Sequence, residues 1–346
     1  MRALTVQPGL ADSIALEDVP PPPPSDGAVL VRALALGICG TDREIVSGAY
    51  GAPPPGAQRL ILGHESLGRV EEAPDGCGFA RGDLVAGIVR RPDPVPCSAC
   101  AVDEWDMCRN GQYTERGIKE RNGYGCEHYR VEPDFLIRID PALDMLGVLM
   151  EPTSIVAKAW EQVMRVGSRS AEWKPRIALV TGAGPVGLLA ALIAKQQGLD
   201  VHVFDHHDTG PKPALVRALG ATYHTDLGTL CPDVVLECTG AGVVIVDVLS
   251  RTTPDGIVCL AGVSSGGREL PLDIGMLNRT LVLENHVVFG SVNANRRHYR
   301  AAAEALAKAD KTWLAGLITR RVPLSRWHEA LEQRPGDIKV VLDFTV

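Results

Sequence analysis

Three cysteines in one short stretch are the first residues of this sequence whose types and spacing could do chemistry. Cys97 and Cys100 are separated by two residues, and Cys108 follows after seven more. Two thiolates at that spacing can bind one zinc ion, because the intervening turn directs both sulfurs to one point. A structural zinc site takes four ligands, and Asp93 or Asp103 could supply the fourth through a carboxylate oxygen. The alternative is a loop with three free thiols.

A glycine-rich turn, Gly-x-Gly-x-x-Gly, lies between two apolar runs. Gly182 permits a tight turn, Gly184 leaves room for a pyrophosphate, and Gly187 lets the next helix pack closely on the preceding strand. The start of that helix offers unpaired N–H groups and partial positive charge to phosphates. Asp205 ends the second apolar run, where an acid can bind ribose hydroxyls. The pattern predicts dinucleotide binding rather than a purely structural strand–helix–strand unit.

Hydrophobic periodicity indicates the elements that must position these residues. Residues 177–180 and 201–204 are expected to be buried strands, and residues 186–194 a helix that is buried nearly all round. The alternation then continues, with strands expected at 234–238, 257–260 and 339–344 and helices at 154–164, 214–219 and 297–308. Strands that alternate with helices predict a parallel sheet. The first 150 or so residues contain β-type runs instead, so we expect them to form a separate domain.

Composition excludes several classes of function. The net charge is −7 and no basic run occurs, which argues against a nucleic-acid or anionic-membrane partner. No apolar run approaches the roughly 20 residues that a membrane-spanning helix needs. The N-terminal residues lack the apolar segment of a signal peptide, so a cytoplasmic location is expected. Nine cysteines, an odd number, suit metal binding and free thiols better than a disulfide framework.

Three further residues are uninformative when each is taken alone. Cys39 could be a small buried hydrophobe, which is the commoner role of a lone cysteine. His64 and its neighbour Glu65 are a single histidine–acid pair. Glu151 precedes Pro152 at the start of an expected helix, where an acid is favoured by the helix dipole.

Together and in order, however, these residues resemble the medium-chain dehydrogenase/reductase superfamily, the zinc alcohol dehydrogenases. The resemblance covers nearly the whole chain and is carried by Cys39, Gly40, Thr41, Asp42, Gly63, His64, Glu65, Gly82, Asp83 and Val85, with the cysteine stretch and the glycine-rich turn. A closer likeness is to the glucose 1-dehydrogenase branch. It rests on residues 89–92, 115–118, 151–154 and 290–293.

The resemblance implies an α/β fold of two domains. A GroES-like β-barrel catalytic domain is expected at residues 1–153, completed by residues 292–346. A Rossmann domain with a doubly wound parallel sheet is expected at residues 154–291, where it would bind NAD. Relatives are dimers or tetramers, so a homo-oligomer is expected, with a tetramer favoured.

The resemblance also implies a catalytic zinc ion. Cys39, His64 and Glu151 would be its ligands, with Glu65 as a direct or water-linked fourth. This set of thiolate, imidazole and carboxylate suits zinc. An open zinc position would bind the substrate hydroxyl and lower its pKa. Thr41 would begin the relay that removes the proton.

For this branch the implied substrate is an aldose, oxidised at its C1 hydroxyl to a lactone by hydride transfer to the nicotinamide. Glu115, Asn293 and Glu151 would bind sugar hydroxyls, since a sugar site needs polar groups that discriminate between hydroxyl patterns. The residues expected at the nucleotide are Gly182, Gly184, Pro185, Val186, Gly187, Asp205, His206, Thr239 and Asn293.

The sequence departs from the branch pattern at three places. Pro94 occupies the first of the four cysteine slots of the structural zinc, and the adjacent Asp93 could substitute. Asp205 is followed by two histidines where many relatives have Gly-Arg-Arg, which holds the 2′-phosphate of NADP. A carboxylate at this position repels a phosphate, so NAD is expected over NADP. Ile155 stands where some sugar-oxidising relatives have an acid.

Two other hypotheses remain open at this point. The same zinc chemistry could act on another polyhydroxylated alcohol, such as a cyclitol, a polyol or a biosynthetic sugar, and Ile155 motivates this alternative. A relative that binds a nucleotide without a catalytic metal would lack the zinc ligands. Cys39, His64 and Glu151 are all present, which argues against that class.

Overall fold

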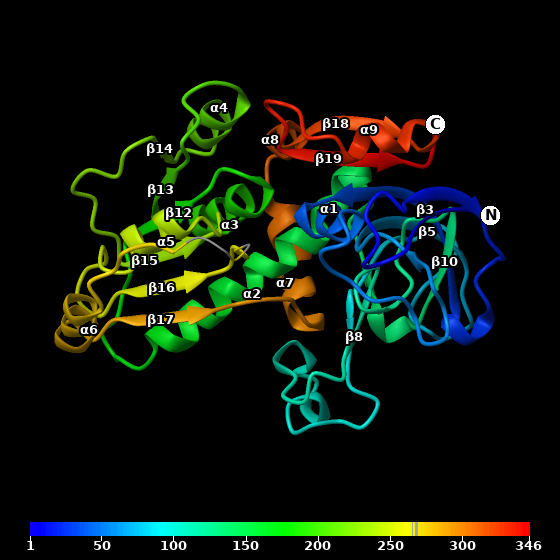
Figure 1. Ribbon diagram of the computed structural model, residues 1–346, viewed down its shortest axis with the longest axis horizontal. Coiled ribbons are helices and arrows are strands. Elements are labelled where there is room, and N and C mark those ends of the chain that lie inside the picture. The colour runs from blue at the N-terminus through cyan, green and yellow to red at the C-terminus, as the bar shows by residue number, and fades with distance from the viewer. Residues whose placement is uncertain (265, 267–268) are drawn as a thin grey trace. The chain divides into compact units, whose positions relative to one another are not determined.

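The computed structural model describes residues 1–264, 266 and 269–346, and the chain forms two compact units (Figure 1). The first unit consists of Met1–Ser154 and Asn293–Val346. The second unit consists of Ile155–Val292. Among the described residues, we find no helix with the length and apolar character that a membrane crossing requires.

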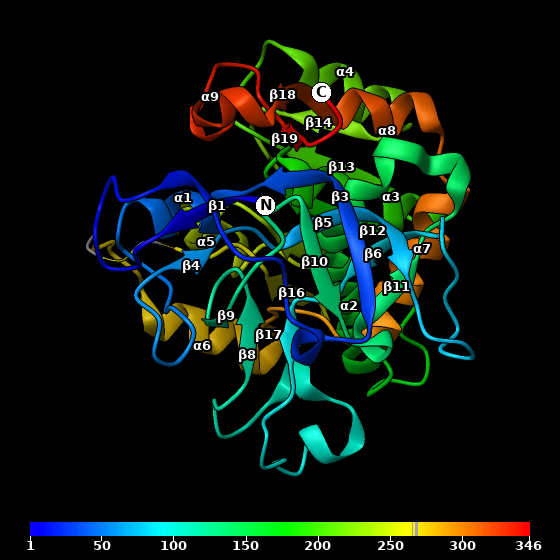
Figure 2. The ribbon, with the colours of Figure 1, turned by 90° about the vertical axis from the view of Figure 1, so that its right-hand side faces the viewer.

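Antiparallel β-structure dominates the first unit. Its largest sheet has the order β11-β6-β5-β3-β19-β18, with β10 also paired to β3 (Figure 2). The long strand β3, Val29–Ile38, is central because it pairs with three strands, β5, β10 and β19. Val31, Leu36 and Tyr129 are among the buried side chains that form the core of this sheet.

The remaining bounds of the first unit follow the chain. Its strands are β1 Arg2–Val6, β2 Ala15–Asp18, β4 Leu60–Ile61, β5 Glu65–Glu72, β6 Leu84–Gly87, β7 Arg90–Arg91, β8 Thr114–Arg116, β9 Glu120–Arg121, β10 His128–Val131, β11 Leu136–Arg138, β18 Ile318–Pro323 and β19 Lys339–Asp343. Its helices are α1 Gly40–Val46, α7 Arg296–Lys308, α8 Lys311–Leu317 and α9 Trp327–Leu331. Between β7 and β8 the cysteine stretch forms a separate excursion, drawn in cyan beyond β8 in Figure 1.

Six parallel strands form the sheet of the second unit, in the order β14-β13-β12-β15-β16-β17. Counted along the chain, this is the third, second, first, fourth, fifth and sixth strand, the order of a doubly wound dinucleotide-binding sheet. The strands are β12 Ile177–Thr181, β13 Asp200–Phe204, β14 Thr222–His224, β15 Val234–Glu237, β16 Ile257–Leu260 and β17 Val287–Gly290. The expected fold class is therefore confirmed.

The helices of this part of the chain are α2 Met150–Gly167, α3 Pro185–Gln196, α4 Pro211–Ala218, α5 Gly242–Val248 and α6 Ile274–Leu283. The apolar side chains from Leu188 to Ala194 in α3 are all buried, as the sequence predicts. Helix α6 did not stand out in the sequence. Of its residues only Leu277 is buried, whereas Ile274, Met276, Val282 and Leu283 are exposed, so no apolar stripe marks one face.

Candidate active site

The end of β3 and the start of β5 bring Cys39 and His64 together. The two strands are antiparallel, with Gly37 opposite Glu65, so the residues just beyond their paired ends are neighbours. Cys39 Sγ lies 3.1 Å from His64 Nε2. The side chains of Cys39, His64 and Glu65 offer ligand atoms that all lie within 4.8 Å of one another. His64 and Glu65 are buried, so this is a compact donor set in a largely dry environment.

Asp42, in the first turn of α1, lies beside the imidazole of His64. Its backbone follows Cys39, the N-cap of that helix, and its carboxylate accepts the Cys39 N–H at 2.9 Å. The other carboxylate oxygen lies 3.3 Å from His64 Nδ1. Burial opposes ionisation of Asp42, but the nearby His64 holds its pKa below the ordinary value. Burial likewise opposes charge on His64, yet Cys39 and Asp42 together raise its pKa well above the usual range.

The donor set therefore suits a bound cation. A thiol, an imidazole and a carboxylate share one buried space, and the imidazole is flanked by two groups that favour positive charge. Asp42 lies 3.3 Å from Nδ1, and Nε2 lies toward Cys39. A carboxylate beside the other ring nitrogen is the usual companion of a metal-binding histidine. The residues present thus fit the zinc ion that the sequence implied.

Glu65 is not free in this arrangement. Lys339, from β19, places its ammonium 2.7 Å from Oε1 and 2.6 Å from Oε2 of Glu65. Lys339 is 1% exposed and also donates to the carbonyl oxygen of Ile38. Gly37 makes room for the pair, because a Cβ atom there would collide with the Glu65 carboxylate.

Glu151 interacts electrostatically with this cluster, and Thr41 follows Cys39 by two residues. Glu151 is buried in the first turn of α2, and its carboxylate is not among the ligand atoms within 4.8 Å of one another. Burial raises the pKa of Glu151 to about 7, with His64 acting in the opposite direction. Thr41 is half-buried in the first turn of α1.

A second polar group is built around Glu115, on the short strand β8. The Asn293 amide donates to Glu115 Oε1 at 2.6 Å. Arg90, from the neighbouring strand β7, donates to the same oxygen through Nε and Nη2, both at 3.0 Å. Arg90 and Glu115 are both buried, and the guanidinium stacks 3.7 Å above the ring of Tyr113. This leaves Glu115 Oε2 as the carboxylate oxygen with free acceptor capacity.

The cysteine excursion brings its three sulfurs together. Cys97, Cys100 and Cys108 offer ligand atoms within 4.8 Å of one another. Asp93 is buried, and its Oδ1 accepts the Val95 N–H, but its carboxylate is outside that set. Its Oδ2 is buried without a hydrogen-bond partner. The excursion thus supplies three soft donors and one nearby carboxylate oxygen that lacks a partner.

The glycine-rich turn in the second unit has the predicted geometry. Gly182 adopts a positive φ of 89°, which disfavours side-chain-bearing residues. A Cβ atom on Gly187 would collide with the carbonyl oxygen of Gly182. Gly184 is the N-cap of α3, and a Cβ atom there would meet nothing within 4 Å. Protein packing thus explains the first and third glycines, whereas the second leaves open space at a helix N-terminus.

Around this turn, Pro185 and Val186 begin α3, and Thr239 follows β15. The Thr239 N–H donates to the buried carboxylate of Glu237 at 2.7 Å. His206, next to Asp205, is largely exposed, with 80% of its side chain accessible.

Asp205 is engaged by its own chain. Its Oδ2 accepts the Ala183 N–H and the Lys212 ammonium, both at 2.8 Å. Its Oδ1 accepts the backbone N–H of His207 at 3.1 Å and lies 2.8 Å from His207 Nδ1. Burial opposes ionisation, but the hydrogen bond from Lys212 and those from His207 hold the pKa of Asp205 well below its usual range.

Sequence reasoning missed three residues that organise these sites, namely Asp42, Lys339 and Arg90. Asp42 belongs to the motif that begins at Cys39, and its capping position after a buried strand could have indicated a structural role. Arg90 lies in residues 89–92, which carry the likeness to the family, but the sequence did not indicate that it binds Glu115. Nothing in the local sequence around Lys339 indicates its partner, because Glu65 is 274 positions away.

The chain is similar to known dehydrogenases in both sequence and structure. Residues 25–141 match the family model of the alcohol dehydrogenase GroES-like domain, and residues 144–344 match that of the glucose dehydrogenase C-terminus. The chain is 39% identical to a glucose 1-dehydrogenase of Methanocella arvoryzae and 40% identical to glucose 1-dehydrogenase 2 of Vulcanisaeta moutnovskia, each over 99% of both chains. It also resembles the crystal structure of Haloferax mediterranei glucose dehydrogenase in complex with NADP, Zn and gluconolactone. That match has a TM-score of 0.91 and 32% identity over 100% of both chains.

Proposed function

The chain belongs to the glucose dehydrogenase branch of the zinc-dependent alcohol dehydrogenases, and from that premise we propose that it oxidises the C1 hydroxyl of an aldose, foremost glucose, to the aldonolactone with NAD as the hydride acceptor. Zinc and a nicotinamide nucleotide are the cofactors of this family. The observation that carries the sugar assignment is the hydrogen bond between Asn293 and Glu115. It joins the buried Glu115 to the half-buried Asn293, which lies 178 positions away in the chain.

Cys39, His64 and Glu151 are the proposed ligands of the catalytic zinc, with Glu65 as the fourth. When bound, the metal supplies Lewis acidity that lowers the pKa of a substrate hydroxyl. Asp42 keeps the His64 ring in the orientation that directs Nε2 toward Cys39. Lys339 holds Glu65 in place, so in a direct contact the Glu65 carboxylate would be shared between the metal and the Lys339 ammonium.

Thr41 is the proposed first acceptor of the proton that the substrate hydroxyl loses. Its hydroxyl is in the first turn of α1, two residues after Cys39. A threonine hydroxyl can accept one proton while it donates its own, so it can pass a proton onward without becoming charged.

Glu115, Asn293 and Glu151 are the proposed sugar-binding residues, and Asn293 is also a proposed nucleotide-binding residue. Arg90 and Asn293 both use Oε1 of Glu115, which leaves Oε2 to accept hydrogen bonds from sugar hydroxyls. Buried polar groups of this kind reject an analogue that lacks the matching hydroxyl, because they would be left unpaired.

Residues 154–291 are the proposed nucleotide-binding domain. The diphosphate would lie at the N-terminus of α3, at the open space beside Gly184, with Pro185, Val186 and Thr239 near it. Asp205 and His206 would face the adenosine ribose. NAD is proposed over NADP because a carboxylate at this position opposes the additional phosphate. NADP is the alternative, and Lys212 is the observation that favours it, since its ammonium partly neutralises Asp205.

A structural zinc is proposed in the cysteine excursion. Cys97, Cys100 and Cys108 would provide three thiolates, and Asp93, whose Oδ2 lacks a hydrogen bond, would provide the fourth ligand after a local shift. We further propose a homo-oligomer, either a tetramer or a dimer, in the cytoplasm.

The alternative substrate is another polyhydroxylated alcohol, namely a cyclitol, a polyol or a biosynthetic sugar. Ile155 favours it, because this apolar side chain is half-buried at a position where an acid would add a polar contact.

The test is the absorbance of reduced nicotinamide with glucose, galactose, xylose, a cyclitol, a polyol and a simple secondary alcohol, each with NAD and with NADP. Fast turnover of an aldose with NAD is expected. Turnover of the cyclitol or polyol alone would contradict the aldose assignment and support the alternative. A preference for NADP would contradict the role proposed for Asp205.

A further inference from the structure

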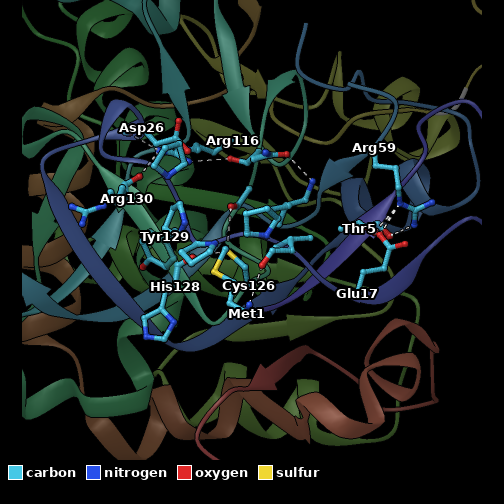
Figure 3. Close-up of a pocket in the computed structure, with 18 residues that line it drawn as sticks. Met1, Thr5, Glu17, Asp26, Arg59, Arg116, Cys126, His128, Tyr129 and Arg130 are labelled. Carbon is cyan, nitrogen blue, oxygen red and sulfur yellow. Dashed lines mark hydrogen bonds and ion pairs between the residues drawn. The ribbon is translucent and has the colours of Figure 1, made fainter. Parts of the chain in front are cut away.

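A cavity of about 290 Å³ lies in the first unit beneath the proline run that follows β2 (Figure 3). Its lining comes mainly from that run, from β1, β2, β4, β8 and β10, and from the segment around Asn122. None of Cys39, His64, Glu65 and Glu115 lines it. Its Arg116 is adjacent to Glu115 on β8, and successive side chains of a strand point to opposite faces. The cavity is therefore separate from the proposed sugar site.

Arg116 is a buried cation without an acidic partner. It is 3% exposed, and its two terminal nitrogens donate to the backbone carbonyl oxygens of Asn122, Asp26 and Arg130. Its Nε is buried without a hydrogen-bond partner. Burial, reinforced by Arg91 and Arg121, lowers the pKa of Arg116 to about 10, while Tyr124 and Glu132 act in the opposite direction. A buried charge is normally offset by an opposite one, but no carboxylate of the described residues lies within ion-pair distance of Arg116.

Arg130 is a second lining arginine, and Glu72 already neutralises it at 3.0 Å. Its terminal nitrogens donate to Ala28 and to the carboxylate of Glu72, while its Nε is buried without a hydrogen-bond partner. Figure 3 shows Arg130 and Asp26 on one side of the cavity. The third lining arginine, Arg59, lies on the opposite side, where Glu17 neutralises it at 2.9 Å. Among the described residues, Arg116 is thus the lining arginine whose charge no carboxylate offsets.

The remaining wall is apolar. Val19, the prolines at 20–23 and Ile61 line it. Proline has no N–H group, so this wall offers no backbone donors from those four residues. A ligand that complements both Arg116 and the apolar wall has an anionic end and an apolar body. A volume of about 290 Å³ is at the lower limit of small-molecule sites, which restricts the ligand to a small molecule.

We propose that this cavity binds a small organic carboxylate, with its anionic group at Arg116 and its apolar body against the proline run. The inference does not depend on the proposed function, because its test measures binding rather than turnover.

The experiment is calorimetric titration of the zinc-loaded full-length protein with benzoate. Benzamide is the neutral probe of the same shape, and inorganic phosphate is the anion without an apolar body. We expect benzoate to bind at least tenfold more tightly than either. Equal binding of benzamide would overturn the anionic requirement, equal binding of phosphate would overturn the apolar one, and no binding of benzoate would overturn the proposal.

Substitutions in the cavity test whether benzoate binds there. Arg116→Gln should weaken benzoate binding at least tenfold, whereas Arg81→Gln, the same change at an exposed turn residue, should leave it unchanged. Because Arg116→Gln removes three backbone contacts and could impair folding, Ile61→Phe is the second variant, which fills the cavity and keeps every charge. It should also weaken binding at least tenfold. Benzoate bound at the catalytic centre instead would bind both variants as it binds the wild type, and that result would overturn the proposal.

Discussion

Lys339 and Glu65 form a fully buried ion pair in which the ammonium contacts both carboxylate oxygens, at 2.7 and 2.6 Å. Lys339 is in β19, near the C-terminus, and Glu65 begins β5, next to His64. The pair therefore ties the last strand of the chain to the proposed metal site.

We expect Lys339→Met to destabilise the protein by about 3–5 kcal/mol, because it leaves a carboxylate buried without a counter-charge. The double variant Lys339→Met with Glu65→Leu should recover most of that loss, because an apolar pair of similar size needs no compensation. The measurement is the free energy of unfolding in urea. Lys311→Met, at an exposed position, is the control. A double variant as unstable as the single one would show that the charge imbalance is not the cause.

Arg90 should act on sugar binding through Glu115. We expect Arg90→Met to raise KM for the sugar at least tenfold, corresponding to about 1.4 kcal/mol, while KM for the nucleotide stays the same. Arg90→Lys should rescue it only partly, because an ammonium cannot reproduce the paired Nε and Nη2 contacts. Steady-state kinetics with each substrate varied in turn separate the two effects. Equal rises in both KM values would indicate general damage to the fold.

Glu132 should make stability depend on pH in the acidic range. Burial opposes its ionisation, but the guanidinium of Arg91, with Arg121, lowers the pKa of Glu132 to about 2. A carboxyl whose pKa is depressed on folding stabilises the protein above its unfolded value, here 4.5, and loses that contribution as the pH falls toward 2. After allowance for partial exposure we expect about 1–2 kcal/mol.

The corresponding variant is Glu132→Gln. Its free energy of unfolding should be lower than that of the wild type at pH 7, and the difference should shrink as the pH falls from 4.5 toward 2. Thermal unfolding of both proteins across this range measures the difference. A constant difference at all pH values would mean that charge is not its origin.

Lys212 should influence the choice of nucleotide. With Lys212→Ala, Asp205 loses the cation 2.8 Å from its Oδ2, so its negative charge opposes a 2′-phosphate more strongly. We expect the ratio of kcat/KM for NAD to that for NADP to rise about tenfold, which is about 1.4 kcal/mol. Lys195→Ala, a change in the last turn of α3, is the matched control. A fall in the ratio would assign Lys212 to binding NAD.

Pro94→Cys should strengthen metal binding in the cysteine excursion. It restores the fourth thiolate of the branch pattern beside Cys97, Cys100 and Cys108, and a four-thiolate set suits structural zinc. We expect zinc to remain on the variant at chelator concentrations that remove it from the excursion of the wild type. Metal analysis after dialysis measures this, with Pro96→Cys as the control for an added thiol. Identical retention in both variants would contradict the proposed site.

Long, regular patterns were readable before the structure was known. The expected strand at 177–180 lies within β12, and the expected helix at 186–194 lies within α3, because each has a continuous apolar signal. Helix α6 could not be found in this way, because most of its apolar residues are exposed. Asp205 was predicted to bind ribose hydroxyls, which remains a prediction, but the sequence did not indicate that its carboxylate also contacts Lys212, His207 and Ala183.

The sequence by itself determined the two-domain α/β fold and the family, because motifs such as the glycine-rich turn and Cys39–Asp42 are local and their spacing is fixed by the geometry of one turn or strand end. Only the tertiary structure decided how the charges are paired. Lys339 meets Glu65 across 274 positions, and Arg116 meets backbone carbonyl oxygens instead of an acid. Ion pairing depends on distances of a few ångströms between side chains, and these are set by the packing of remote strands rather than by spacing along the chain.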